Sequence, residues 1–125
     1  MKELKAVQDS LSMLTGKGAI VLAVTSESDL AIETTISKTS VSFPIIHDKD
    51  YKIMKMFGVN LTVDPATLAL MHKYGVDMDI NNGNNDHVLP VPATYVIGKG
   101  GKVTYIHFDQ SYKNRASVSQ ILSAL

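Results

Sequence analysis

The chain has 125 residues, with 12 basic and 12 acidic side chains and a formal net charge of zero. Balanced charge without a basic run argues against a nucleic-acid partner, because proteins that bind phosphate backbones carry a basic surface. The longest apolar run, residues 19–24, is too short to cross a bilayer, and the N-terminus lacks the apolar core of a signal peptide, so we expect a cytoplasmic protein with no membrane partner.

The first part of the chain predicts a helix, a strand and a second helix. Leucine and valine recur at helical spacing in residues 2–14, which indicates an amphipathic helix ended by the glycines that follow. Residues 19–25 are apolar without alternation, a pattern typical of a parallel strand covered on both faces. Ser26 and Asp29 resemble a capping box that opens a weaker helix through about residue 38.

The middle of the chain is expected to hold shorter elements. Residues 43–46 predict a strand, which Pro44 pushes toward a sheet edge. Residues 51–57 predict a short helix, and residues 64–75 predict a helix with an aspartate N-cap, a proline at its first position and a glycine after its end. Residues 77–87 are polar and rich in turn formers, so we expect a loop there.

The last part of the chain predicts an antiparallel hairpin and a final helix. Residues 93–97 and 102–108 are apolar runs joined by a connection too short for a parallel crossover. Apolar spacing in residues 118–125 indicates an amphipathic helix. The element order predicts an α/β layer structure that forms one domain, residues 1–125, long enough to bury about two-thirds of its unfolded surface.

No metal or cofactor is expected. Alternation of Asp77, Asp79 and Asn81 resembles the start of a calcium loop, but Asn82 stands where that loop needs glycine and Val88 where it needs glutamate. The four histidines stand at no recognised metal spacing, and the chain has no cysteine to offer as a thiolate ligand. A solvated loop and ordinary polar histidines are therefore the favoured interpretation.

Pro92 stands directly before the apolar run 93–97. A cis bond there would aim the Val91 backbone toward an adjacent helix start, and cis bonds are rare enough to suggest a purpose. On composition alone, an ordinary trans proline at a strand start is favoured.

From Leu4 to Leu125 the chain resembles the alkyl hydroperoxide reductase/thiol-specific antioxidant family of the thioredoxin-like superfamily, and most closely its peroxiredoxin-like subgroup. Residues 89–97 carry the most specific part of this resemblance. Weaker matches follow the family's order at residues 19–25, 43–48, 56–59 and 82–83, and at Asp109, Tyr112 and Arg115. The resemblance implies a thioredoxin-like mixed sheet flanked by helices, and an antioxidant oxidoreductase activity in which a cysteine reduces hydroperoxides or disulfides.

That activity needs a thiolate, and this chain has no cysteine. In the family, a strand and a Cys-Pro-x-Cys-like turn precede the helix that begins here at Met1. The resemblance therefore implies that the N-terminal central strand and the reactive cysteine are missing, so we expect no catalytic residue in the chain and no peroxidase activity. It also implies a cis bond at Pro92, and it places Val91, Pro92 and Ala93 beside the reactive centre as binding residues.

The missing strand would lie between the strands that match residues 19–25 and 93–97, and both would then expose an edge. We expect that these edges meet, that they pair with a second copy in a homodimer, or that the fold is marginal. The redox partner cannot be named from the sequence.

A function of a different class also fits the sequence. The scaffold can serve as a non-catalytic protein- or ligand-binding module whose contact surface is residues 59–88, because loops on a rigid scaffold often carry function. Saturable binding that is lost on deletion of residues 77–87 would distinguish this alternative from the redox function.

Overall fold

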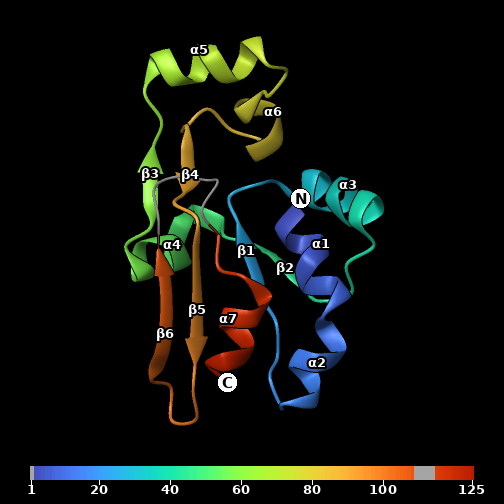
Figure 1. Cartoon of the computed structure of the whole chain (residues 1–125). Coiled ribbons are helices and arrows are strands. Elements are labelled where there is room, and N and C mark those ends of the chain that lie inside the picture. The colour runs from blue at the N-terminus through green and yellow to red at the C-terminus, as the bar shows by residue number, and fades with distance from the viewer. Residues whose placement is uncertain (1, 109–114) are drawn as a thin grey trace.

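The structure is a computed structural model that describes residues 2–108 and 115–125. Within these residues the strands form three separate two-stranded sheets, one parallel and two antiparallel (Figure 1). The pairs are β1 (Ala23–Thr25) with β2 (Ile45–His47), β3 (Asn60–Thr62) with β4 (Val88–Pro90), and β5 (Ala93–Ile97) with β6 (Val103–Phe108). Parallel and antiparallel pairing combined with helices confirms the predicted mixed α/β class.

Helices surround these strand pairs and extend beyond them. They are α1 (Lys2–Asp9), α2 (Leu11–Gly16), α3 (Asp29–Thr39), α4 (Lys52–Phe57), α5 (Pro65–Lys73), α6 (Met78–Asn82) and α7 (Val118–Ser123), and a 3₁₀ turn at Lys49–Tyr51 leads into α4. Figure 1 shows α5 and α6 as a projection at the end of β3 and β4, and the Asn81 carbonyl oxygen of α6 accepts from the Ser28 N–H at the start of α3. No helix in the described part of the chain is long and apolar enough to cross a membrane.

Three predictions about helices were wrong, and side-chain capping explains two of the differences. The predicted helix 2–14 is divided at Ser10, which leaves helical geometry and whose carbonyl accepts hydrogen bonds from the first turn of α2. The cap of α3 is Ser28, whose hydroxyl accepts from the Ala31 N–H, and not Ser26, which is buried. The predicted loop 77–87 contains α6 because the Asp77 carboxylate accepts from the Ile80 N–H and so caps a short helix.

The predicted strand 19–25 is regular only over β1. β1 pairs with β2 along one edge, and among the described residues no strand lies along its other edge. Without that second neighbour, Ile20 and Leu22 remain 85% and 59% exposed. The predicted strand at 43–46 shifts to β2, and the Pro44 carbonyl accepts the hydrogen bond from the Ala23 N–H.

β1 and β5 are therefore not paired with each other among the described residues. Like β1, β5 has one hydrogen-bonded neighbour, which is β6, and within the described residues no backbone pairing joins the two sheets. Of the three alternatives expected for these edges, the first, that they meet, does not occur among the described residues, because each strand keeps only its local partner. This arrangement agrees with a thioredoxin-like sheet that lacks its N-terminal central strand.

The core cluster lies under the start of β5. Its buried members are Met54 of α4, Val59 and Val91, and partly buried residues pack around them. The rings of Phe57 and Tyr95 add a contact at a centroid distance of 4.6 Å. Val91 is part of this buried cluster, so the loop that enters β5 packs on the core.

Candidate functional site

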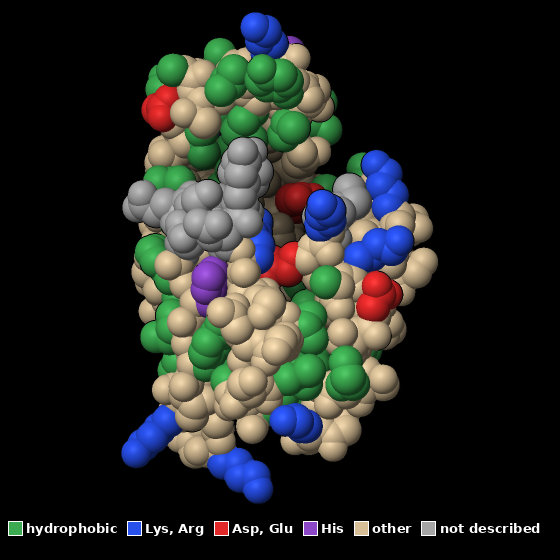
Figure 2. All heavy atoms as spheres, in the orientation of Figure 1, with side chains coloured by type: hydrophobic (Ala, Val, Ile, Leu, Met, Phe, Trp, Pro, Cys, Tyr) green, Lys and Arg blue, Asp and Glu red, His purple; other side chains and the backbone are tan. Residues whose placement is uncertain are grey.

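A cleft of about 330 Å³ opens beside the loop that enters β5. It lies where β1 ends, where the β3–β4 pair passes, and where the chain leaves β4. Its lining residues are Thr25, Ser26, Glu27, Leu61, Leu89, Pro90, Val91, Pro92 and Arg115. The strand pair and the loop supply apolar side chains, whereas the end of β1 and Arg115 supply polar and charged ones. Acidic and basic side chains also gather around a hollow near the middle of the face drawn in Figure 2.

The structure brings two of the three predicted binding residues to this cleft. Val91 is 7% exposed, and its N–H donates to the Val59 carbonyl oxygen at 2.7 Å. Pro92 is half-buried and lines the cleft beside it. Ala93 begins β5 and packs against the core cluster, and it is not part of the cleft lining.

The predicted cis bond before Pro92 was wrong. Every peptide bond among the described residues is trans. The hydrogen bond from Val91 to Val59 extends the β3–β4 pairing by one residue, to Val91. In this setting the ordinary preference of an X–Pro bond for trans, about 0.5–1 kcal/mol, is unopposed.

Two charged residues that are far apart in the sequence, Glu27 and Arg115, line the cleft. Glu27 follows β1 and is half-buried, and burial raises the pKa of its carboxyl above the ordinary value. The guanidinium of Arg115 donates to a Glu3 carboxylate oxygen at 2.8 Å, so α1 is tied to the cleft. A carboxyl with a raised pKa can exchange protons nearer neutral pH than an exposed glutamate, and a guanidinium attracts anions.

The sequence reasoning did not predict that Glu27 and Arg115 line the same cleft. Glu27 carried a usable signal, because a charged residue two positions after an apolar run marks the end of the strand. Arg115 was part of the resemblance, without a predicted role. Asp109 and Tyr112, the other two residues quoted near it, lie outside the described residues.

A buried hydrogen-bond network supports the floor of the cleft. Ser26 is 1% exposed, and its hydroxyl donates to the Asn82 side-chain oxygen at 3.2 Å. The Asn82 amide nitrogen donates to the Val88 carbonyl oxygen at 3.0 Å. The network joins the end of β1, α6 and β4, so the polar segment around Asn82 is an anchor of the site and not a solvated loop.

His47 also supports the polar side of the cleft. Its ring nitrogen Nδ1 lies 2.7 Å from the Glu27 carbonyl oxygen, and an N–H at that position donates the hydrogen bond. This contact fixes the backbone that presents the Glu27 carboxyl.

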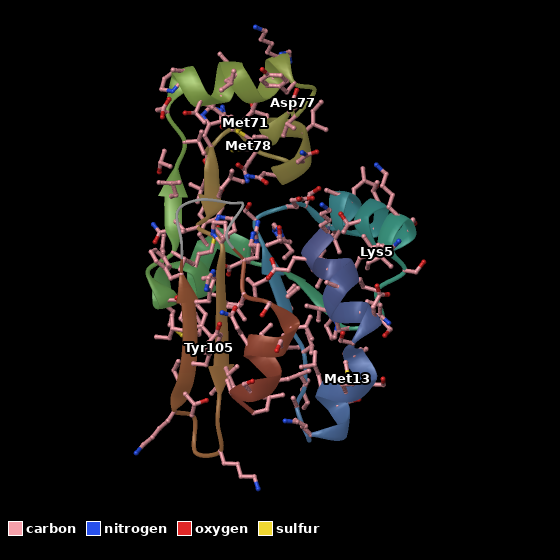
Figure 3. All side chains as sticks on the ribbon, viewed as in Figure 1. Lys5, Met13, Met71, Asp77, Met78 and Tyr105 are labelled. Atoms are coloured by element: carbon pink, nitrogen blue, oxygen red, sulfur yellow. The ribbon has the colours of Figure 1, made fainter. Side chains whose placement is uncertain are left out.

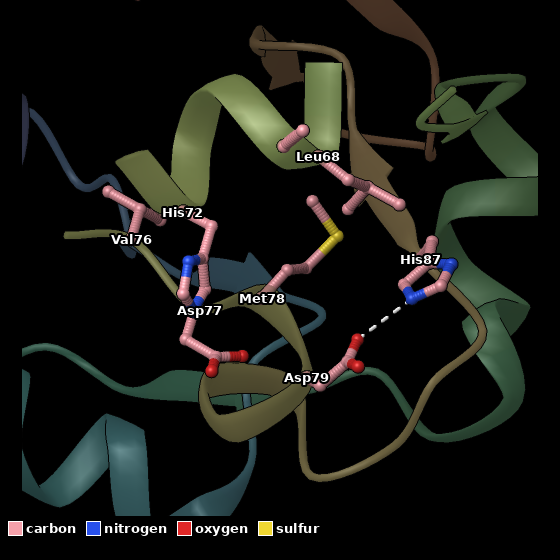
Figure 4. Close-up of a pocket in the computed structure, with 8 residues that line it drawn as sticks. Leu68, His72, Val76, Asp77, Met78, Asp79 and His87 are labelled. Atoms are coloured by element: carbon pink, nitrogen blue, oxygen red, sulfur yellow. Dashed lines mark ion pairs between the residues drawn. The ribbon is translucent and has the colours of Figure 1, made fainter. Parts of the chain in front are cut away.

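A second cavity, of about 360 Å³, lies between α5 and α6. Figure 3 labels Met71, Asp77 and Met78 where these helices approach each other, and Figure 4 shows the ion pair between His87 Nε2 and Asp79 at 2.9 Å. Asp77 caps α6, so the carboxylates that suggested a calcium loop serve as a helix cap and an ion-pair partner. No group of three metal-binding side chains occurs in the part of the chain that the structure describes.

The chain was compared with known proteins. Residues 1–106 match the model of the AhpC/TSA family. That range includes α1, the strands β1 to β5, most of β6, and every cleft residue except Arg115. No curated protein matches the chain.

Proposed function

Because the chain belongs to the AhpC/TSA family, we propose that it is the scaffold of a peroxiredoxin-like oxidoreductase whose reactive cysteine comes from outside these residues. The observation that carries this proposal is the cleft lined by Thr25 at the end of β1 and by Val91 and Pro92 just before β5. Each of these two strands has a single hydrogen-bonded neighbour among the described residues. A strand placed between them would bring the residue after it toward the cleft.

The reaction would require a thiolate. Its sulfur attacks one oxygen of a hydroperoxide, the O–O bond breaks, and a sulfenate and water or an alcohol are formed. A thiol reductant then returns the sulfenate to the thiol through a mixed disulfide. The chain itself has no cysteine, so we expect it to be inactive alone.

The chain would contribute the surroundings of the reacting sulfur. Val91 and Pro92 form an apolar wall, and Arg115 is the cation that lines the cleft. A neighbouring cation lowers the pKa of a thiol and so favours the nucleophilic thiolate. A cytoplasmic location fits this proposal, because the thiol reductants that recycle such a cysteine are maintained there.

A peroxide assay tests the proposal in two arms. With dithiothreitol present, the 125-residue chain should consume hydrogen peroxide no faster than buffer. The DNA upstream of the Met1 codon should encode, in frame, a strand and a Cys-Pro-x-Cys-like turn, and a chain extended by that segment should turn over peroxide. Replacement of its first cysteine by serine is the matched control and should abolish turnover.

Two results would contradict the proposal. Clear turnover by the cysteine-free chain would show that another group carries the chemistry. A stop codon or an unrelated reading frame upstream would favour the non-catalytic alternative.

That alternative, a binding module, is favoured by the exposed apolar side chains of the α5–α6 projection. Leu70, Tyr74 and Ile80 are 54%, 75% and 73% exposed. Figure 2 shows hydrophobic side chains gathered at the end of the molecule that holds α5, and large exposed apolar patches often mark interaction sites. The variant Tyr74→Ser/Ile80→Ser should weaken saturable binding without unfolding the chain, whereas deletion of residues 77–87 would also remove the buried Asn82 anchor.

A further inference from the structure

Residues 19–25 have the apolar sequence of a buried strand, but only residues 23–25 form a strand. Their apolar pattern calls for cover on both faces, yet Ile20 is 85% exposed and Leu22 is 59% exposed. The structure records no hydrogen bond from the backbone of residues 20–22 to any other described residue. The segment runs from α2 up to β1 along an edge that no described strand covers (Figure 1).

The segment also lacks the features with which proteins protect a strand edge. Residues 19–25 contain no charged residue and no proline, the two devices that most often block edge-to-edge pairing. A strand of this composition favours pairing with a second strand of similar character.

The charged residues that flank residues 19–25 indicate that the pairing strand is the same segment of a second copy. Lys17 stands just before the segment and Glu27 just after it. When two copies of the segment run antiparallel about a two-fold axis at Leu22, the positive end of each copy meets the negative end of the other. The Lys17 ammonium now donates to the Leu122 carbonyl oxygen at 3.1 Å, and its remaining donors can reach a carboxylate.

We propose that the 125-residue chain, in which no described strand covers this edge, forms a two-fold symmetric dimer in which residues 19–25 of each copy pair antiparallel across Leu22. A strand supplied from outside these residues, as in the proposed function, would occupy the same edge and exclude this dimer. Ile20 of one copy lies opposite Val24 of the second, and the two Leu22 side chains meet at the axis. Such a contact is self-complementary, as a two-fold interface requires. It covers the exposed apolar side chains and gives the backbone of residues 20–22 its missing partners.

Sedimentation equilibrium on the full chain, over a range of concentrations, tests the proposal. The unmodified chain should be a dimer. Leu22→Lys places two ammonium groups face to face at the axis and should convert the dimer to a monomer, because like charges directly opposite each other repel. Met13→Lys, at the comparably exposed Met13 of α2 (Figure 3), should leave the dimer intact.

A charge exchange tests the register. Lys17→Glu alone and Glu27→Lys alone should each raise the dimer dissociation constant, because each variant sets like charges at both ends. The double variant should restore the original dissociation constant. Circular dichroism checks that every variant remains folded.

Hydrogen exchange on the unmodified chain provides a test that needs no variant. The amides of residues 20–22 should exchange slowly at concentrations where the dimer forms and rapidly on dilution. The proposal is overturned by a chain that stays monomeric at every concentration, by a dimer that survives Leu22→Lys, or by a double charge variant no tighter than the single ones.

Discussion

The strands β1 and β5 each have one hydrogen-bonded neighbour, yet β1 is shorter than predicted and β5 spans its whole predicted length. β5 covers Ala93–Ile97 as predicted, whereas β1 keeps only Ala23–Thr25 of the predicted seven-residue run, residues 19–25. β5 has a partner that is close in sequence, β6, and a core cluster beneath its first residues. β1 depends on β2, about twenty residues away, and has no described neighbour on its other edge. An apolar run therefore becomes a full strand only where neighbours are available.

The largest expected effect is a difference in the free energy of unfolding between a variant in the core beside β5 and a variant in the exposed segment before β1. Met54 is 1% exposed, so Met54→Ala should lower the free energy of unfolding by about 2–5 kcal/mol through lost burial and a cavity. Leu22 is 59% exposed, so Leu22→Ala should change that free energy by less than about 0.5 kcal/mol under dilute, monomeric conditions. Urea denaturation measures both. Similar losses would remove the contrast between the two strands.

The next effect concerns the helix start that supports the core cluster. Asp48 is buried, and its carboxylate accepts from the N–H groups of Ile53 at 2.9 Å and Met54 at 2.8 Å. Asp48→Ala should lower the free energy of unfolding by about 1–3 kcal/mol, because buried donors lose their acceptor. Asp48→Asn keeps one acceptor oxygen and should lose less. An alanine variant as stable as the unmodified chain would show that water replaces the carboxylate.

A smaller effect is expected at the anchor between β1 and α6. Asn82→Ala removes the bond to the Val88 carbonyl and the partner of the Ser26 hydroxyl, and should cost about 1–2 kcal/mol in urea denaturation. Asn85→Ala, at an exposed position nearby, is the matched control and should be nearly neutral. Equal results for the two variants would mean that α6 does not anchor the end of β1.

The smallest effect concerns the pH dependence of stability. Burial raises the pKa of Glu27 in the folded chain, so the folded state holds this proton more tightly than the unfolded state. The free-energy cost of ionising Glu27 in the folded chain is absent below the pKa of the unfolded state. It becomes complete as the pH rises through the higher pKa of the folded state. Glu27→Gln should therefore raise the melting temperature slightly above that window and leave it unchanged at low pH. Thermal unfolding at a series of pH values would reveal the opposite trend if a cation stabilises the charged carboxylate instead.

Local signals were read correctly from the sequence where the interaction partners are close in the chain. The N-cap at Asp64, whose carboxylate accepts from the Thr67 N–H at 2.8 Å, and the β5–β6 hairpin are of this kind. The pairing of β3 with β4 was missed because each strand has three residues and the partners are separated by α5 and α6. A three-residue strand carries too little alternation to be recognised alone.

The candidate site was predictable only in part, for a related reason. Val91 and Pro92 stand in a run whose order of residues is specific. Glu27, Arg115 and Asn82 reach the cleft from three distant segments, and their meeting depends on how the sheets and helices pack. The spacing of residues in the sequence does not show which distant segments meet. Only the structure therefore revealed the charged residues of the cleft and the buried hydrogen-bond network.

The short connection between β5 and β6, residues 98–102, also has a consequence for the order of folding events. A hairpin of this kind closes in about 1–10 μs, because little chain entropy is lost. The Glu3–Arg115 contact joins residues 112 positions apart and must form after most of the chain is already compact. The hairpin with α4 is thus expected to be the folding nucleus, with β1 and the two chain ends added last.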